Sequence, residues 1–163
     1  MQSWQPAYVG IGSNLGDSRE RVIRAIAALG ELPRTRLVAQ SPLYATTPFG
    51  PVPQPDFLNA AAGLLTSLTP DGFFDALRAL ERELGRTPPR ERWGPREIDL
   101  DLLVFGRLIR TEARLTLPHP GIAERDFVLF PLRDLAPDLE VPGVGVVRDL
   151  AAAVQDRGMR RLH

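Results

Sequence analysis

The order of the predicted strands and helices constrains the fold more than any other feature of this sequence. A strand over residues 7–12 leads into a glycine-broken loop, and Asp17 or Ser18 can cap the helix that follows. Gly30 is placed to end this helix. A β-rich segment over residues 36–50, interrupted by two prolines, is expected to be a strand that leaves the sheet as a long loop.

A third strand is predicted over residues 57–68, and Thr69 followed by Pro70 is a typical helix start. The apolar stripe of this helix closes at Gly85, and a fourth strand is predicted over residues 98–105. The order strand–helix–strand–strand–helix–strand is the split βαβ arrangement of ferredoxin-like α+β sandwiches. We therefore expect an antiparallel sheet with both helices on one face.

The last third of the chain is expected to be an irregular extension with a short helix over residues 149–154, because several prolines interrupt it. No long linker divides the sequence, so residues 1–163 are expected to form a single domain. A formal net charge of zero argues against a polycation that binds nucleic acid. The chain has no cysteine, no apolar run of membrane-spanning length and no signal-peptide layout, which favours a cytoplasmic location.

Two aspartates share one face of the fourth predicted strand. Side chains two residues apart on a strand project from the same face, so Asp99 and Asp101 point together, opposite Leu100. A carboxylate pair on a stiff strand suits Mg²⁺, and two such ions can clamp a phosphoryl or nucleotidyl group during transfer. Aspartate is depleted in strands. Metal binding, pairing with arginine and a plain solvated sheet face are the three interpretations of this pair.

The loop before that strand carries several arginines around Trp93, namely Arg86, Arg90, Arg92 and Arg96. The chain contains no lysine, so anions have to be bound by guanidinium groups, whose planar fork suits phosphate. A tryptophan bordered by glycine and proline favours a lid that closes over a site. A solvated, charged loop is the alternative.

Other polar and aromatic residues also suit a binding site. Asn59 is able to bond a planar heterocycle and Phe57 to stack on it, although a turn and a core position are equally compatible with the segment. His119 lies between two prolines, which suits either rigid presentation to a ligand or a structural turn. Arg125 and Phe127 are two residues apart, so an extended segment would direct both to one side.

Four segments together resemble the 6-hydroxymethyl-7,8-dihydropterin pyrophosphokinase family: GSNLGD, SPLYATTPFGPVPQPDFLNA, ERWGPREIDLDLLVFG and LTLPHPGIAERDFVLFPL. The resemblance extends over nearly the whole chain. It implies a ferredoxin-like sandwich that transfers the β,γ-diphosphate of ATP to the hydroxymethyl group of the pterin in folate biosynthesis, releasing AMP. It further implies two Mg²⁺ ions, ATP as co-substrate and small-molecule substrates only, and a monomer is expected.

The resemblance also implies roles for individual residues. The metal ligands would be Asp99 and Asp101, and the catalytic arginines would be Arg86 and Arg96. The ATP contacts would be Glu81, Trp93, Arg114, Thr116, His119 and Arg125. The pterin contacts would be Thr46, Phe49, Phe57, Asn59, Phe127 and the closing Trp93. The chain departs from the family pattern at Thr47, Arg78 and Pro88.

Two other functions remain open at this level. A two-metal nucleotidyltransferase that releases pyrophosphate would use the same acids on the same sheet, so the reaction products distinguish it. An RNA-binding sandwich would need a basic sheet face with stacking aromatic residues. The zero net charge and the acids on the fourth strand argue against the RNA-binding alternative.

Overall fold

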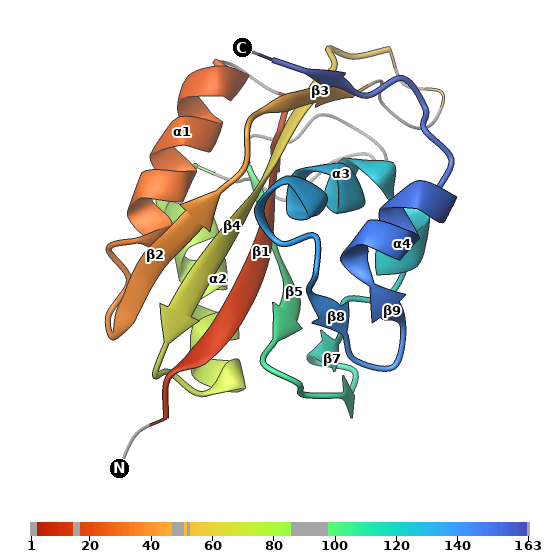
Figure 1. Ribbon diagram of the computed structural model, residues 1–163. Coiled ribbons are helices and arrows are strands. Elements are labelled where there is room, and N and C mark those ends of the chain that lie inside the picture. Colours follow the sequence, from red (N-terminus) through yellow and green to blue (C-terminus); the bar gives the residue numbers. More distant parts are fainter. Residues whose placement is uncertain (1–2, 15–16, 47–50, 52, 86–97, 163) are drawn as a thin grey trace.

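One antiparallel sheet forms the centre of the computed structural model, which describes residues 3–14, 17–46, 51, 53–85 and 98–162 (Figure 1). The order across the sheet is β10-β3-β4-β1-β5, and β2 also pairs with β4, so β5 lies at an edge. The strands are β1 (Gln5–Ser13), β2 (Thr35–Gln40), β3 (Tyr44–Thr46), β4 (Phe57–Thr66), β5 (Asp99–Phe105) and β10 (Arg160–Arg161).

Helices α1 (Ser18–Leu29) and α2 (Pro70–Glu83) both pack on one face of this sheet. The Asp17 carboxylate caps α1 by accepting the backbone N–H of Glu20 at 3.2 Å, and the Thr69 hydroxyl caps α2 by accepting that of Gly72 at 3.0 Å. The apolar stripes of both helices are buried against β1, β4 and β5. The predicted ferredoxin-like arrangement is confirmed.

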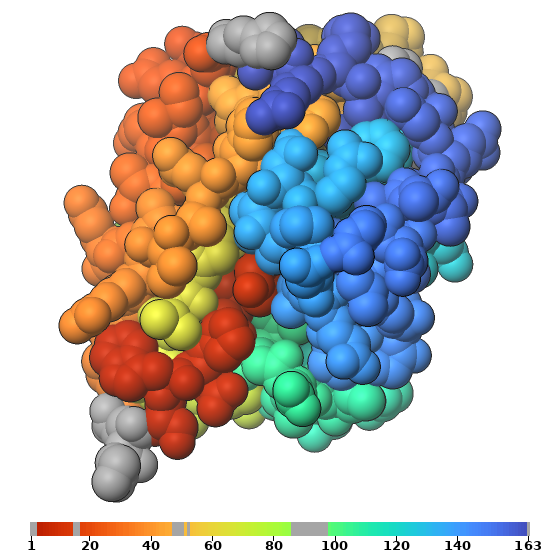
Figure 2. Space-filling view, viewed as in Figure 1, coloured from red at the N-terminus to blue at the C-terminus, as the bar shows by residue number. Residues whose placement is uncertain are grey.

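The C-terminal third is more regular than expected. It places α3 (Asp126–Leu135) and α4 (Val147–Ala153) on the opposite face of the sheet, where they form a second core with Ala61 and Leu103 (Figure 1). In Figure 2 these blue helices cover the sheet on one side and leave the orange surface of β2 uncovered. Helix α3 accommodates Pro131 because burial of its apolar residues outweighs one lost backbone hydrogen bond.

The remaining elements of the extension are short. They are β6 (Arg110–Thr111), β7 (Thr116–Leu117), the 3₁₀ helix η1 (Ile122–Glu124), β8 (Glu140–Val141) and β9 (Gly145–Val146). Among the helices of the described residues, none has both the length and the apolar composition needed to cross a membrane.

The segment after β2 returns to the sheet, whereas the sequence predicts that it leaves as a loop. Ser41 keeps the chain attached to β4: its backbone N–H donates to Ala61 at 2.9 Å, and its hydroxyl accepts the Ala61 N–H at 2.8 Å. Pairing then resumes in β3, where Tyr44 lies opposite Asn59. The break at Pro42 is therefore local.

Candidate active site

The floor of the candidate site is a row of residues that crosses the sheet on the face bearing α3. Asp99 of β5 lies opposite Gly12 of β1, which lies opposite Asn59 of β4. Asp101 lies opposite Gly10 in the next row on that face. Directly opposite residues of an antiparallel pair share a face. The carboxylates and the amide therefore border the same surface, with glycines between them.

Because Gly10 and Gly12 have no side chains, only backbone lies between the acids and Asn59 on this face. A Cβ atom built on Gly12 would lie 3.0 Å from the Asn59 side-chain oxygen, which is closer than nearly all real contacts of such an atom. A Cβ atom built on Gly10 would lie 3.5 Å from Leu103, an ordinary contact distance. A side chain at position 12 would thus displace the amide, and its absence leaves space between the acids and Asn59.

At the end of the row away from the acids, predicted pterin contacts lie together. Asn59 is 7 % exposed and donates from its amide nitrogen to the Thr46 hydroxyl at 3.0 Å. Phe57 precedes it on the same face of β4, and Phe127 lies in the first turn of α3. Asn59 therefore occupies a strand, which excludes the turn that its segment also allowed. Phe49 lies outside the described residues.

Asp99 and Asp101 are both half-buried on β5 and point to the same side. Among the described residues, no group of three or more histidine, aspartate or glutamate side chains has the arrangement of a metal site. Within the part of the chain that the structure describes, the donor set at this point is the pair of carboxylates of Asp99 and Asp101. This set fits Mg²⁺, which is commonly bound through one or two carboxylates, with water and substrate oxygens completing its shell.

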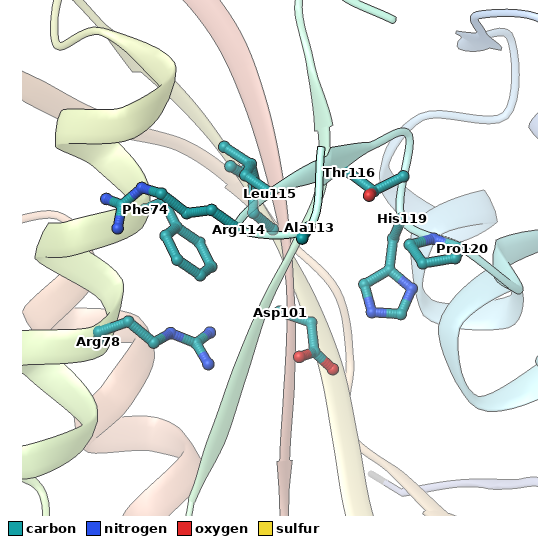
Figure 3. Close-up of a pocket in the computed structure, with 10 residues that line it drawn as sticks. Phe74, Arg78, Asp101, Ala113, Arg114, Leu115, Thr116, His119 and Pro120 are labelled. Carbon is teal, nitrogen blue, oxygen red and sulfur yellow. The ribbon is translucent and has the colours of Figure 1, made fainter. Parts of the chain in front are cut away.

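A pocket of about 210 Å³ opens beside Asp101 at the edge of β5 (Figure 3). Figure 3 shows the Asp101 carboxylate between the guanidinium group of Arg78, from α2, and the imidazole of His119. The lining residues are Phe74, Arg78, Asp101, Leu102, Ala113, Arg114, Leu115, Thr116, His119 and Pro120. The pocket thus brings together one metal candidate and three of the predicted ATP contacts, Arg114, Thr116 and His119.

His119 is held at the pocket by its backbone, which donates to the Leu103 carbonyl at 2.8 Å. Its Nδ1 atom is buried and has no hydrogen-bond partner in the described part of the chain. Buried polar atoms are normally satisfied, so an unpartnered nitrogen on a side chain that lines the pocket is unusual. This position favours the ligand-binding interpretation of His119.

Arg114 and Thr116 line the pocket while also bonding within the protein. The Arg114 guanidinium pairs with Asp71 at 3.2 Å and with Asp75, and it lies 5.4 Å from the ring centroid of Phe74. The carboxylates of Asp75 and Asp71 raise the pKa of Arg114. The Thr116 hydroxyl donates to a backbone carbonyl at 2.9 Å. These contacts fix the loop between β6 and β7 against α2.

Glu81, a predicted ATP contact, lies inside the protein. Its side chain is 3 % exposed, accepts the backbone N–H of Leu100 at 2.8 Å and pairs with Arg78 at 3.1 Å. The carboxylate therefore supports β5 from the side and is not on the pocket wall. Arg78, which the sequence marked only as a departure from the family pattern, lines the pocket and donates to the Leu100 carbonyl. The i, i+3 spacing with Glu81 was the available signal.

Arg125 and Phe127 lie together, though not in the extended segment that the sequence suggested. Arg125 joins η1 to α3, and its guanidinium lies 5.7 Å from the ring centroid of Phe127. The buried Asp126 between them was missed from the sequence. The other predicted site residues, Arg86, Trp93 and Arg96, lie outside the described residues, as do Arg90 and Arg92.

The chain is similar to known proteins in both sequence and fold. Residues 8–137 match the model of the 7,8-dihydro-6-hydroxymethylpterin-pyrophosphokinase family. The chain is 48 % identical over 158 residues to the 2-amino-4-hydroxy-6-hydroxymethyldihydropteridine pyrophosphokinase of Pseudomonas aeruginosa, covering 97 % of both chains. It is 40 % identical to the enzyme of the same name from Haemophilus influenzae, with 96 % of this chain and 98 % of that one covered.

Solved structures show the same fold at low identity. A crystal structure of Plasmodium falciparum HPPK-DHPS with pteroate superimposes on 93 % of this chain with a TM-score of 0.72 and 13 % identity. The chain spans 42 % of that protein, so the likeness concerns one part of a longer molecule.

Proposed function

The chain belongs to the 7,8-dihydro-6-hydroxymethylpterin-pyrophosphokinase family, and from that membership we propose how its residues perform the reaction. The chain is a pyrophosphokinase of folate synthesis that transfers a diphosphate to the pterin hydroxymethyl group. ATP is the proposed donor and AMP the proposed second product. The observation that carries the proposal is the row Asp99–Gly12–Asn59, which puts acids and an amide at two ends of one surface.

The pterin is proposed to lie at the Asn59 end of this row. An amide presents both a donor and an acceptor, as do the edges of a pterin ring, and Thr46 fixes the orientation of the amide. Phe57 and Phe127 are apolar groups on the same side that suit stacking against a flat heterocycle. Phe49 and Trp93 are proposed to complete this end of the site.

The phosphates of ATP are proposed to lie at the acid end, in the pocket beside Asp101. Asp99 and Asp101 would hold Mg²⁺, two ions in our proposal, which when bound would neutralise phosphate charge and lower the pKa of the pterin hydroxyl. His119 lines the pocket and is proposed to bond a phosphate oxygen through its imidazole, and Arg125 supplies positive charge beside Phe127. Arg114 and Thr116 border the nucleotide, and Arg86 and Arg96 are proposed to balance the charge of the leaving group.

The site residues on the paired strands β1, β4 and β5 suit an in-line transfer. The hydroxymethyl oxygen of a pterin held at Asn59 would point along the glycine surface toward the acids, where the β-phosphorus is bound. The pterin hydroxyl gives up its proton to water, and the bond from its oxygen to the β-phosphorus forms as the bond from that phosphorus to the oxygen shared with the α-phosphate breaks. AMP leaves with that oxygen. Residues 1–163 are proposed to act as a single-domain monomer in this reaction.

The test is to incubate the protein with ATP, Mg²⁺ and 6-hydroxymethyl-7,8-dihydropterin and to measure AMP and pterin diphosphate. We expect Asp101→Ala to lower kcat by about a thousandfold or more, as for other losses of transition-state charge stabilisation, without changing the circular-dichroism spectrum. Asp149→Asn, an exposed change on α4, is the control and should retain activity. Release of pyrophosphate instead of AMP, or full turnover by Asp101→Ala, would contradict the mechanism.

A further inference from the structure

The last residues of the described chain cross the end of the sheet where the pterin contacts lie. We call residues 156–162 the C-terminal strap. Within it, β10 runs beside β3 (Figure 1) in the register Arg160↔Ala45. The Arg160 guanidinium also pairs with Asp56 at 2.7 Å. The strap therefore touches β3 just before Thr46 and the chain just before Phe57, two segments that carry predicted pterin contacts.

A third attachment joins the strap to the start of α3. Asp126 is 4 % exposed, and its two carboxylate oxygens each accept one backbone N–H at 2.8 Å. One N–H belongs to Phe127 and the other to Arg157 in the strap. A buried carboxylate is unfavourable unless it is hydrogen-bonded, so these two bonds account for its presence inside the protein.

The residues on both sides of Asp126 are the ones that the site uses. Arg125 has extended backbone angles, φ −117° and ψ 102°, and caps α3 without a side-chain hydrogen bond. Its guanidinium reaches the ring of Phe127, the residue whose N–H the Asp126 carboxylate accepts. The conformation of this short turn thus decides where both side chains lie.

We propose that Asp126 is a positioning residue for the transfer reaction. By joining the strap to the first turn of α3, its carboxylate holds Phe127, and with it Arg125, in the orientation that the substrates need. The inference rests on the proposed function, in which Arg125 contacts ATP and Phe127 contacts the pterin. A carboxylate offers one oxygen acceptor to each N–H group, whereas asparagine would turn its NH₂ toward one of them.

The experiment compares Asp126→Asn with the wild type in steady-state kinetics and in pterin binding with a non-hydrolysable ATP analogue present. We expect the KM and the Kd of the pterin to rise about tenfold, the effect of losing one buried, charge-assisted hydrogen bond, with kcat changed less than about threefold. An unchanged pterin KM in a folded, active variant would overturn the proposal.

Asp156→Asn is the matched control. Asp156 lies in the strap itself, and its carboxylate accepts the N–H groups of Gly158 and Met159 at 2.9 and 3.0 Å without contacting α3. Both N–H groups bond the same oxygen, which asparagine retains, so this variant should keep the strap in place and leave the pterin KM unchanged. Equal increases of KM in both variants would also overturn the proposal, because the effect would then follow from removing a negative charge near the strap and not from the bonds that Asp126 makes to Phe127 and Arg157.

If Asp126→Asn does not fold, Arg157→Pro tests the same hydrogen bond from its other side. It removes the strap's N–H donor at an exposed position, leaves the carboxylate in place, and should raise the pterin KM by a similar factor. A wild-type protein that forms no pterin diphosphate would refute the proposed function, and the positioning role with it. Active wild type with unaltered KM in both variants would refute the positioning role alone.

Discussion

Asp71, in the first turn of α2, accepts hydrogen bonds from two arginines. Arg110 bonds both carboxylate oxygens, at 2.9 and 3.0 Å, and Arg114 bonds one at 3.2 Å. These bonds, that from Arg110 most of all, hold the pKa of Asp71 below its ordinary value of 3.8. A carboxylate with a lowered pKa stabilises the folded state above the unfolded-state pKa, and this contribution is lost as the pH falls through the folded-state pKa.

We therefore expect Asp71→Asn to lower the free energy of unfolding at neutral pH and to become indistinguishable from the wild type in acid. The difference should be constant well above pH 3.8 and shrink below it, because both proteins then carry a neutral group at position 71. Urea unfolding of both proteins at a series of pH values measures this difference in the free energy of unfolding. Asp149→Asn, in the first turn of α4, is the control, since no arginine among the described residues bonds Asp149. If the difference in the free energy of unfolding between the two proteins grew as the pH fell, the stabilising role given to the Asp71 carboxylate would be contradicted.

Several residues of the site could be predicted from the sequence, but the residues that they contact could not. Alternation alone put Asp99 and Asp101 on one face, because side-chain direction in a strand is local. The contact of Asn59 with Thr46 and the position of Gly12 between Asn59 and Asp99 depend on how distant strands align. That register follows from burial across the whole sheet, which local patterns do not contain.

Strand β5 is an edge strand whose outward backbone groups are bonded by neighbouring elements. Glu81 accepts the N–H of Leu100, Arg78 donates to the carbonyl of Leu100, and His119 donates to that of Leu103. Leu100 lies between the two aspartates. Helix α2 therefore helps to hold the carboxylate pair in place, although neither Arg78 nor Glu81 is one of the proposed metal ligands.

We expect Glu81→Ala to lower the free energy of unfolding by about 3 kcal/mol, because it leaves a guanidinium and a backbone N–H without their buried partner. Glu81→Gln, which keeps an acceptor for the N–H of Leu100, should cost about half as much. Urea unfolding with circular dichroism measures both. Wild-type stability in Glu81→Ala, together with a weaker affinity for ATP, would instead support a direct contact with the nucleotide.

At the level of elements, the sequence predicted the parts that have strong local signals. Caps at Asp17 and Thr69 and regular apolar spacing identified α1 and α2, alternation identified β1 and the first half of β5, and β4 was predicted from its apolar run before the helix start at Thr69. Helix α3 was missed because Pro131 lies within it, and a proline inside a helix removes a backbone hydrogen bond and normally ends or kinks the helix. Its stability comes from packing on the sheet, which is a tertiary effect.

The molecule as a whole has two apolar cores that share one sheet. Leu77 of α2 lies in the core on one face and Leu132 of α3 in the core on the other, and both are fully buried. Since β4 and β5 contribute to both cores, the two faces are expected to unfold together, as a single domain does.

Leu77→Ala and Leu132→Ala should each lower the free energy of unfolding by about 3 kcal/mol. In each variant, far-ultraviolet circular dichroism and tryptophan fluorescence should give the same urea midpoint, because neither face is stable without the other. A Leu132→Ala protein that loses part of its helical signal in a separate, earlier transition would show that the α3 face unfolds independently.

The bare surface at Gly12 also bears on how the protein would respond to an inhibitor. Resistance to an active-site drug commonly arises when a larger side chain obstructs the drug and spares the substrate. At position 12 even one added methyl group would press on the Asn59 amide that the proposed substrate uses. A larger side chain at position 12 that obstructs a compound on this surface is therefore expected to weaken pterin binding as well, which reduces the ways in which resistance can arise there.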